Sequence, residues 1–157
     1  MHSLLRLEAS GFAEWVRESE SIFAYAGVLL LHTIGMGIVV GINAVIDLRV
    51  LGVAPRIQIR SLRPFLPVLW VGFWINAVTG AVLLVIHASK FTAMPDFYLK
   101  LAFIALALIN LQLLKVEIFD RGDSDHAVAS TRAKALGATS IVLWLAAITA
   151  GRLLAYL

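Results

Sequence analysis

The sequence predicts an all-α protein, a transmembrane four-helix bundle, and three observations lead to this prediction. Four apolar runs each hold about 20 residues or more, the length that an α-helix needs to cross a hydrocarbon core about 30 Å thick. Hydrophobic residues make up 61% of the 157 residues and charged residues only 15%, which is far from the composition of soluble domains. Because backbone groups at that depth cannot bond to water, each run must satisfy its own hydrogen bonds as a helix.

The four predicted spans use nearly the whole chain. They cover approximately Ile22–Ile46, Phe65–Ala88, Phe97–Phe119 and Ala138–Leu157. We therefore expect a single integral membrane domain over residues 1–157, with no room for an independent catalytic domain. The chain contains no cysteine, which excludes disulfides, thiolate metal sites and cysteine nucleophiles.

The first twenty residues do not resemble a signal peptide, because four glutamates interrupt them and no short apolar core follows a basic start. Leu5, Phe12, Trp15 and Val16 can share one face of a helix. This pattern predicts a short N-terminal amphipathic helix that lies in the membrane interface. A frayed tail is the alternative.

Lys and Arg fall mainly on alternate connections between the spans. The first and third connections and their flanks hold Arg49, Arg56, Arg60, Arg63, Lys115, Arg121, Arg132 and Lys134. By the positive-inside rule these connections face the cytoplasm, and both termini face outward. The net charge of +3 therefore reflects topology, so we expect membrane lipids as neighbours and no nucleic-acid partner.

Polar residues inside the spans are the candidate functional residues, because they are costly in lipid and usually face the bundle interior. His32 lies about 15 Å from the outer end of its span, close to the midplane. Asn76 and Asn110 lie at similar depth in the second and third spans, so the three side chains could form one midplane set. Interhelical hydrogen bonds worth about 0.6 kcal/mol explain the two asparagines equally well. His32 is open to both a structural and a functional role, since imidazole binds metals and carries protons.

Glycines follow His32 along the first span, at positions 35, 37 and 41. The spacing of Gly37 and Gly41 is typical of closely packed membrane helices. These glycines could also admit a flat cofactor, although packing is the simpler explanation.

A haem-binding bundle is one hypothesis for His32, because four-helix membrane cytochromes hold haem b between histidines on facing helices. His87 ends the second span, about 15 Å from His32 along the bundle axis, which excludes ligation of one iron by both histidines within one chain. Haem would then need a single protein ligand, a non-histidine ligand such as Met36, or ligands shared between chains. His32 and Met36 could alternatively contact copper, with His32 as the metal ligand.

Charged residues near the span ends give a second cluster. Lys100 and Arg152 lie one turn inside the outer ends of their helices, and Arg152 could bind a lipid headgroup or a quinone oxygen. Snorkelling to the interface explains both cations without any function. At the opposite ends, we expect Asp47 and Arg49 to pair and fix a turn. The cofactor-binding candidates are His32, Met36, Asn76, Asn110, Lys100 and Arg152.

Three segments and their order resemble a family of uncharacterised bacterial integral membrane proteins. The segments are Leu31-His32-x-x-Gly35, Asp47-Leu48-Arg49-x-Leu51-Gly52 and Ala150-Gly151-Arg152-x-x-Ala155-Tyr156, with Thr79-Gly80, Phe97-x-x-Lys100, Asn110 and Trp144 between them. The resemblance runs from about Glu18 to the C-terminus and implies a four-span protein of the bacterial inner membrane. It marks His32, Asp47, Arg49, Lys100, Asn110 and Arg152 as family positions without giving them roles. The sequence departs from the family at Met94, where the family pattern has asparagine before the proline. A looser likeness to copper-resistance proteins and cytochrome b561-like bundles implies that the protein binds a metal ion or haem.

Three functions are compatible with these residues. The first is a small membrane subunit of a respiratory or other redox assembly, which holds haem b or quinone near His32. The second is an oligomeric ion or small-solute carrier, with a polar line that joins Arg152, His32 and Glu117. The third is a structural or assembly protein without a cofactor. An intramembrane enzyme is the weakest hypothesis, because no paired carboxylates, zinc motif or serine–histidine arrangement occurs at useful depth. We expect the chain to work as a homo-oligomer or within a larger complex.

Overall fold

The computed structural model describes residues 10–18, 24–120 and 130–156, and within these ranges the chain forms helices and no strand. The helices are α2 (Gly11–Glu18), α3 (Tyr25–Leu51), η1 (Ile59–Leu62), α4 (Phe65–Ile86), α5 (Ala88–Thr92), α6 (Pro95–Lys115), η2 (Val116–Asp120) and α7 (Thr131–Tyr156). Four of them are long and apolar enough to cross a membrane, at the positions of the four predicted spans. The predicted all-α four-helix fold is confirmed.

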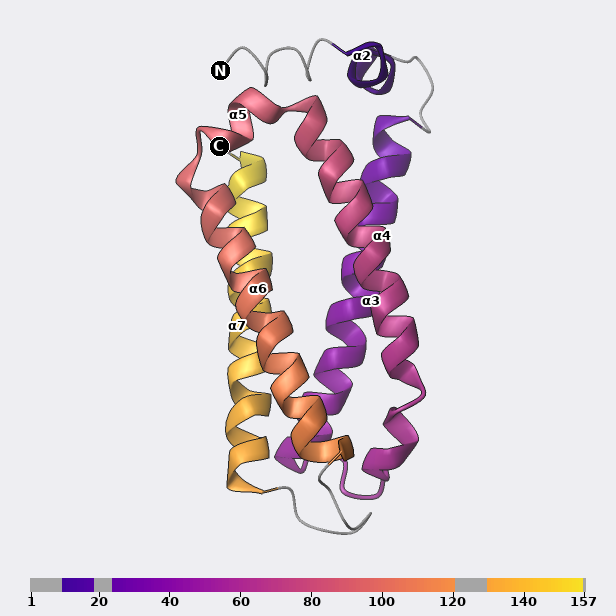
Figure 1. The fold of residues 1–157 in the computed structure, drawn as a ribbon, viewed down its shortest axis with the longest axis vertical. Helices are drawn as coiled ribbons and strands as arrows, with labels where there is room; N and C mark the ends of the chain where they lie inside the picture. Colours follow the sequence, from indigo (N-terminus) through magenta and orange to yellow (C-terminus); the bar gives the residue numbers. More distant parts are fainter. Residues whose placement is uncertain (1–9, 19–23, 121–129, 157) are drawn as a thin grey trace.

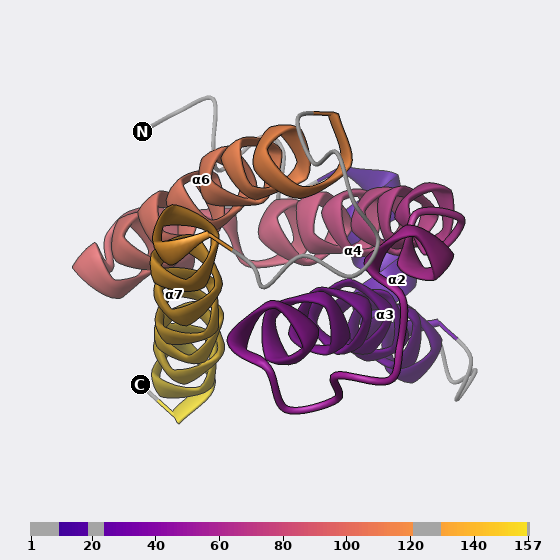
Figure 2. The same ribbon diagram turned by 90° about the horizontal axis from the view of Figure 1, so that it is seen from below.

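The long helices form two hairpins, α3 with α4 and α6 with α7, and the hairpins meet mainly along α3 and α7 (Figures 1 and 2). Viewed along the bundle, the four helices occupy the corners of a square in the order α3, α4, α6, α7 (Figure 2). We call the end that carries α2, α5 and the last turn of α7 the terminal end, and the opposite end, with η1 and η2, the arginine end (Figure 1).

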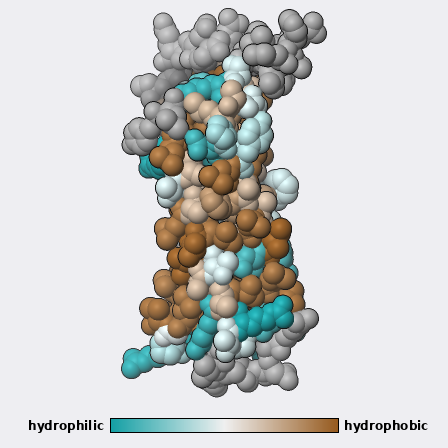
Figure 3. Space-filling model, turned by 90° about the vertical axis from the view of Figure 1, so that its left-hand side faces the viewer, coloured by the Kyte–Doolittle hydropathy of each residue, from teal (hydrophilic) through white to brown (hydrophobic). Residues whose placement is uncertain are grey.

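The exterior of the bundle is unusually apolar. Only 22% of the residues in the most apolar window of α3, and 33% in that of α7, are buried inside the protein. Hydrophobic side chains dominate the middle of the molecule, whereas hydrophilic ones gather towards both ends (Figure 3). A surface of this kind is stable in lipid and not in water, which indicates a multi-pass membrane protein.

Two clusters of buried apolar residues hold the hairpins together. One lies at the arginine end and contains Ile46, Val50, Leu62, Leu66, Leu114 and Ala133. The other lies in the middle of the bundle and contains Val39, Leu69, Ala107, Leu111 and Trp144. Both clusters draw on all four long helices. Further buried apolar side chains, among them Ile86, Ala88 and Leu154, lie at the terminal end.

Glycines of α3 and α4 let these two helices approach closely. A Cβ atom at Gly35 would lie 2.7 Å from the backbone nitrogen of Asn76 and 2.8 Å from the carbonyl oxygen of Gly72. In contrast, a Cβ atom at Gly37 or Gly41 would meet no atom within 4 Å. Among the residues that the structure describes, the Gly37 and Gly41 spacing therefore packs no helices together, because both glycines face outward. Gly35 makes the contact between helices instead.

Two helices run further than the apolar pattern predicts. α3 continues five residues past Ile46, to Leu51, and is capped by Gly52, whose φ of 95° is the left-handed conformation that favours glycine at a helix end. α7 begins at Thr131, seven residues before the predicted start. Hydropathy marks the part of a helix that lies in lipid, whereas the hydrogen-bonded helix continues until its backbone is capped.

The N-terminal helix α2 lies at the terminal end, against α4 (Figure 1). Its Val16 is buried and its Trp15 is 60% exposed, so these two residues do not share a packing face. Leu5 lies outside the described residues. The amphipathic, interfacial character of α2 stays a prediction.

Candidate functional site

His32 is held in a polar site between α3 and α4, in the terminal half of the bundle. Its Nδ1 lies 3.0 Å from the carbonyl oxygen of Asn76 and 3.1 Å from the hydroxyl oxygen of Thr79. The Asn76 side chain makes a second hydrogen bond between the helices, because its Nδ2 donates to the carbonyl oxygen of His32 at 2.8 Å. The Thr79 hydroxyl donates to the Ile75 carbonyl at 2.6 Å. The imidazole is therefore fixed to α4 through one ring nitrogen.

A cation from the other hairpin completes this site. Lys100 of α6 is half-buried and close enough to interact electrostatically with His32. Its side chain lies over Gly151 of α7, where an added Cβ atom would be 3.4 Å from Cε and 3.6 Å from Nζ. On the opposite side, a Cβ atom at Gly80 would be 3.0 Å from Cε1 of His32. Two glycines thus make room for the side chains of His32 and Lys100. We call His32, Asn76, Thr79 and Lys100 the His32 site.

The predicted midplane set of three side chains does not converge. His32 and Asn76 are in contact, but Asn110 lies towards the arginine end, where its Nδ2 donates to the Leu136 carbonyl oxygen at 2.9 Å. α3 begins at Tyr25, so His32 is about 10 Å from the start of its helix. The predicted depth of His32 in the membrane stays a prediction.

A second polar site lies at the arginine end, between α3 and α7. Asn43, Asp47 and Ser140 are each 0% exposed, and the Asn43 amide donates to Asp47 Oδ2 at 2.6 Å and to Ser140 Oγ at 2.5 Å. The other oxygens, Asn43 Oδ1 and Asp47 Oδ1, are buried and have no hydrogen-bond partner. Gly137 lets the α7 backbone approach, since its Cβ would lie 3.4 Å from the Asp47 carbonyl oxygen. We call Asn43, Asp47 and Ser140 the Asp47 site.

The expected pair of Asp47 and Arg49 is wrong. Both residues lie within α3, and Arg49 donates through Nε to the carbonyl oxygen of Ile57, which ties the connection after α3 to the helix. Two residues apart on a helix, the side chains project in different directions and do not face each other. Asp47 therefore turns into the bundle, and Arg49 turns towards the connection.

The remaining candidates are spread over the molecule. Met36 is half-buried on α3, one turn from His32, and Arg152 is exposed on α7. His87 joins α4 to α5 and stacks edge-on against Tyr25, with ring centroids 6.1 Å apart. Glu117 bonds to Ser130 and pairs with Arg132 at the arginine end. In the described part of the chain, no three His, Asp or Glu residues are grouped as a metal site would require.

No family model, curated protein or solved structure matches this chain. The resemblance to an uncharacterised bacterial membrane family therefore stays a prediction. Several of its motif residues have physical roles here: Gly80 and Gly151 accommodate His32 and Lys100, and Gly52 caps α3.

Sequence reasoning missed Thr79 as a site residue, and it missed Asn43 and Ser140 as partners of Asp47. A signal existed for the first site, because Thr79 follows Asn76 by three residues and precedes Gly80, which places all three near one face of a helix. Ser140 carried no signal, since a lone serine in an apolar helix is common and usually bonds to its own backbone.

Proposed function

We propose that this small multi-pass membrane protein is a subunit of a respiratory or other redox membrane assembly, and that it binds a quinone head group beside His32. The observation that carries the proposal is the way His32 is held. A backbone carbonyl can only accept a hydrogen bond, so the Nδ1 contact with Asn76 assigns the ring proton to Nδ1. A neutral imidazole in this tautomer offers the lone pair of Nε2 to a ligand.

Lys100 supports the same ligand class from the other side. A quinone oxygen accepts hydrogen bonds, and an ammonium group is a strong donor to it. Nε2 of His32 can accept the hydroxyl proton of the reduced quinol form. The two groups come from different hairpins, so a ligand between them would join α3 and α6.

Haem b, the other expected cofactor, suits these residues less well. The contact of Gly35 with α4 leaves no room for a macrocycle between α3 and α4 beside His32. His32 and Met36 are about 6 Å apart along one helix and project from the same face, so they cannot hold one iron from opposite sides. Haem would require a single ligand or a second chain.

The apolar exterior of α4 supports a place in a larger assembly. The outer face of α4 exposes a series of large apolar side chains, among them Val71, Trp74 and Val78 at 58–62%. Such a face packs against lipid or against a partner helix.

Quinone titration with tryptophan fluorescence as the readout tests the proposal. A water-soluble short-chain quinone should quench the purified protein saturably, and His32→Leu and Lys100→Met should each weaken binding at least tenfold. Lys115→Met, at the arginine end, is the matched control and should bind like the wild type. A visible spectrum with a haem band lost in His32→Ala would favour haem instead, and a colourless protein without quinone binding would leave a scaffold role.

An ion-handling role is the second candidate, and the Asp47 site favours it. A fully buried carboxylate in a membrane span is a functional candidate by default, because its charge is costly there. No Lys, Arg or His of the described residues forms an ion pair with Asp47, and one of its oxygens has no donor. A bound proton or alkali cation would compensate this charge. The predicted line from Arg152 through His32 to Glu117 is interrupted, however, by the apolar cluster around Trp144.

A further inference from the structure

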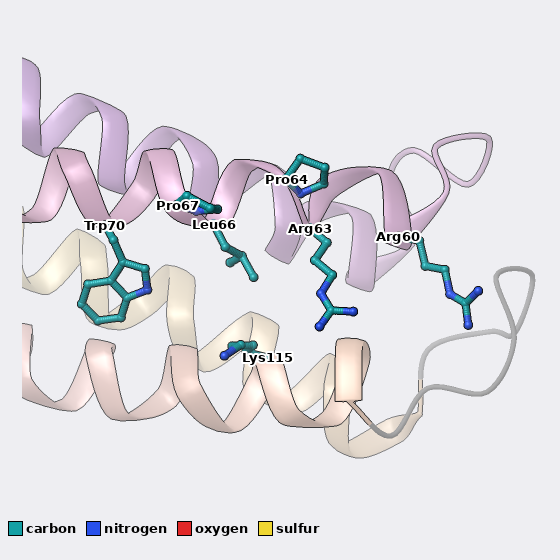
Figure 4. A pocket seen from close by; sticks show the side chains of 7 residues that line it. All are labelled: Arg60, Arg63, Pro64, Leu66, Pro67, Trp70 and Lys115. Carbon is teal, nitrogen blue, oxygen red and sulfur yellow. The ribbon is translucent and has the colours of Figure 1, made fainter.

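A basic groove lies between the start of α4 and the end of α6, at the arginine end of the bundle (Figure 4). It measures about 680 Å³ and is lined by Arg60, Arg63, Pro64, Leu66, Pro67, Trp70 and Lys115. Leu66 and Trp70 project from α4 towards α6, and Lys115 faces them from α6 (Figure 4). The groove is distinct from the His32 site and from the Asp47 site, and it does not depend on the proposed function.

The charged residues among the described lining of this groove are all cationic. Three of its seven lining residues are cationic, and none of the seven is a carboxylate. Arg63 precedes α4 and Lys115 ends α6, so cations that are distant in sequence converge from two hairpins. This convergence favours binding of an anion at the mouth of the groove.

The inner wall of the groove is apolar. Leu66 belongs to the buried cluster at the arginine end, and Trp70 stacks edge-on against Phe73 with ring centroids 5.4 Å apart. Trp70 follows Arg63 by seven residues, which is about 10 Å along the helix axis. An anion held at Arg63 therefore has an apolar surface directly below it, in the direction of the hydrocarbon core.

We propose that this groove binds an anionic phospholipid, with the phosphate between Arg63 and Lys115 and an acyl chain along Leu66 and Trp70. Basic pockets between membrane helices recognise lipid phosphates in this way. α4 and α6 are the neighbouring helices that contact each other least, so their seam can accept a chain from the surrounding bilayer. A free phosphate ion would make no favourable contact with the apolar wall. If the cations only set the orientation of the protein in the membrane, they would not need to converge on one groove.

Brominated lipids test the proposal, because bromine on an acyl chain quenches a tryptophan in contact with it. The protein is placed in nanodiscs of phosphatidylcholine that contain a small fraction of phosphatidylglycerol, with bromine on the chains of either lipid. We expect brominated phosphatidylglycerol to quench beyond its mole fraction. That excess should be lost in Trp70→Phe and should persist when inorganic phosphate is added.

The charge requirement is tested by a double variant and a matched control. Arg63→Gln with Lys115→Gln should weaken the preference for the anionic lipid roughly 30-fold, at about 1 kcal/mol for each cation. Arg56→Gln with Lys90→Gln removes the same charge from two exposed positions outside the groove and should keep the preference. Equal quenching by both lipids in the wild type, or equal loss in the two double variants, would overturn the proposal. Competition by inorganic phosphate would do the same, because the site would then be one for a free anion.

Discussion

At the scale of single residues, α3 carries two polar side chains in opposite circumstances. His32 has the donor of its ring satisfied by a carbonyl oxygen, and this bond fixes the tautomer and the ring orientation. Asp47 accepts a hydrogen bond from Asn43 through Oδ2, while its Oδ1 is buried without a donor. An unpaired buried charge is far costlier than a neutral group of the same shape. The Asp47 carboxylate therefore needs a compensating positive charge or a proton, whereas a neutral His32 does not.

Asp47→Asn tests whether the carboxylate needs a bound cation. The amide keeps the size of the side chain and removes the charge. In choline chloride we therefore expect the free energy of unfolding of the variant to exceed that of the wild type by at least about 1 kcal/mol. If sodium is the compensating ion, sodium chloride should raise the unfolding midpoint of the wild type and leave that of the variant unchanged. Thermal unfolding in detergent, followed by intrinsic fluorescence, measures both effects.

Asp120→Asn is the control for this prediction, because Asp120 is exposed at the same end of the bundle. It should behave like the wild type in both salts. If sodium has no effect on the wild type, infrared spectroscopy at neutral pH should detect a protonated carboxyl group that is missing from Asp47→Asn. A destabilised Asp47→Asn protein, with neither a sodium effect nor a carboxyl band in the wild type, would mean that Asp47 has a purely structural role.

At the scale of the helices, backbone contact between α3 and α4 positions the His32 site. Gly35 brings the helices together one turn from His32, and the Asn76 side chain then reaches the carbonyl oxygen of His32. Small residues permit this approach because association in lipid depends on packing rather than on a hydrophobic driving force between helices. The same helix carries Gly37 and Gly41 on an outward face, where they pack against nothing in the described part of the chain.

Gly35→Ala and Gly41→Ala form a matched pair of variants for this contact. The added methyl group at position 35 would overlap the backbone of α4, so the helices must separate, and we expect a loss of roughly 1–3 kcal/mol in the free energy of unfolding. At position 41 the same change meets open space and should be neutral or slightly stabilising. Unfolding in detergent by denaturant measures the difference, and equal stability of the two variants would refute the close contact.

At the scale of the whole molecule, four crossings place α2 and the last turn of α7 at one end, and most described cations at the other (Figure 1). Arg56, Arg60, Arg63 and Arg132 lie at the arginine end, whereas Lys90 and Arg152 lie at the terminal end. The positive-inside rule then predicts that the arginine end faces the cytoplasm. The basic groove would in that case face the anionic lipid of the inner leaflet.

Single cysteines test this orientation cleanly, because the natural sequence has none. Ser61→Cys and Ser89→Cys place exposed thiols at the arginine end and at the terminal end. In cells or right-side-out vesicles, a membrane-impermeant thiol reagent should label position 89 and not position 61, and inverted vesicles should give the reverse. Labelling of both positions from one side would contradict a bundle that spans the membrane, and the opposite pattern would reverse the orientation.

The sequence by itself determined the number of spanning helices, their class and their approximate positions, because length and hydropathy are local properties of each run. It also marked His32 and Asn76 as polar residues inside spans that could meet, as two members of a possible set with Asn110. Only the tertiary structure decided that Asn110 lies with Leu136 rather than with His32, and that Asp47 meets Asn43 and Ser140 rather than Arg49. The physical reason is that contacts between helices depend on the rotation and axial register of each one. Side-chain packing sets both, and a nearly uniform apolar pattern does not encode them.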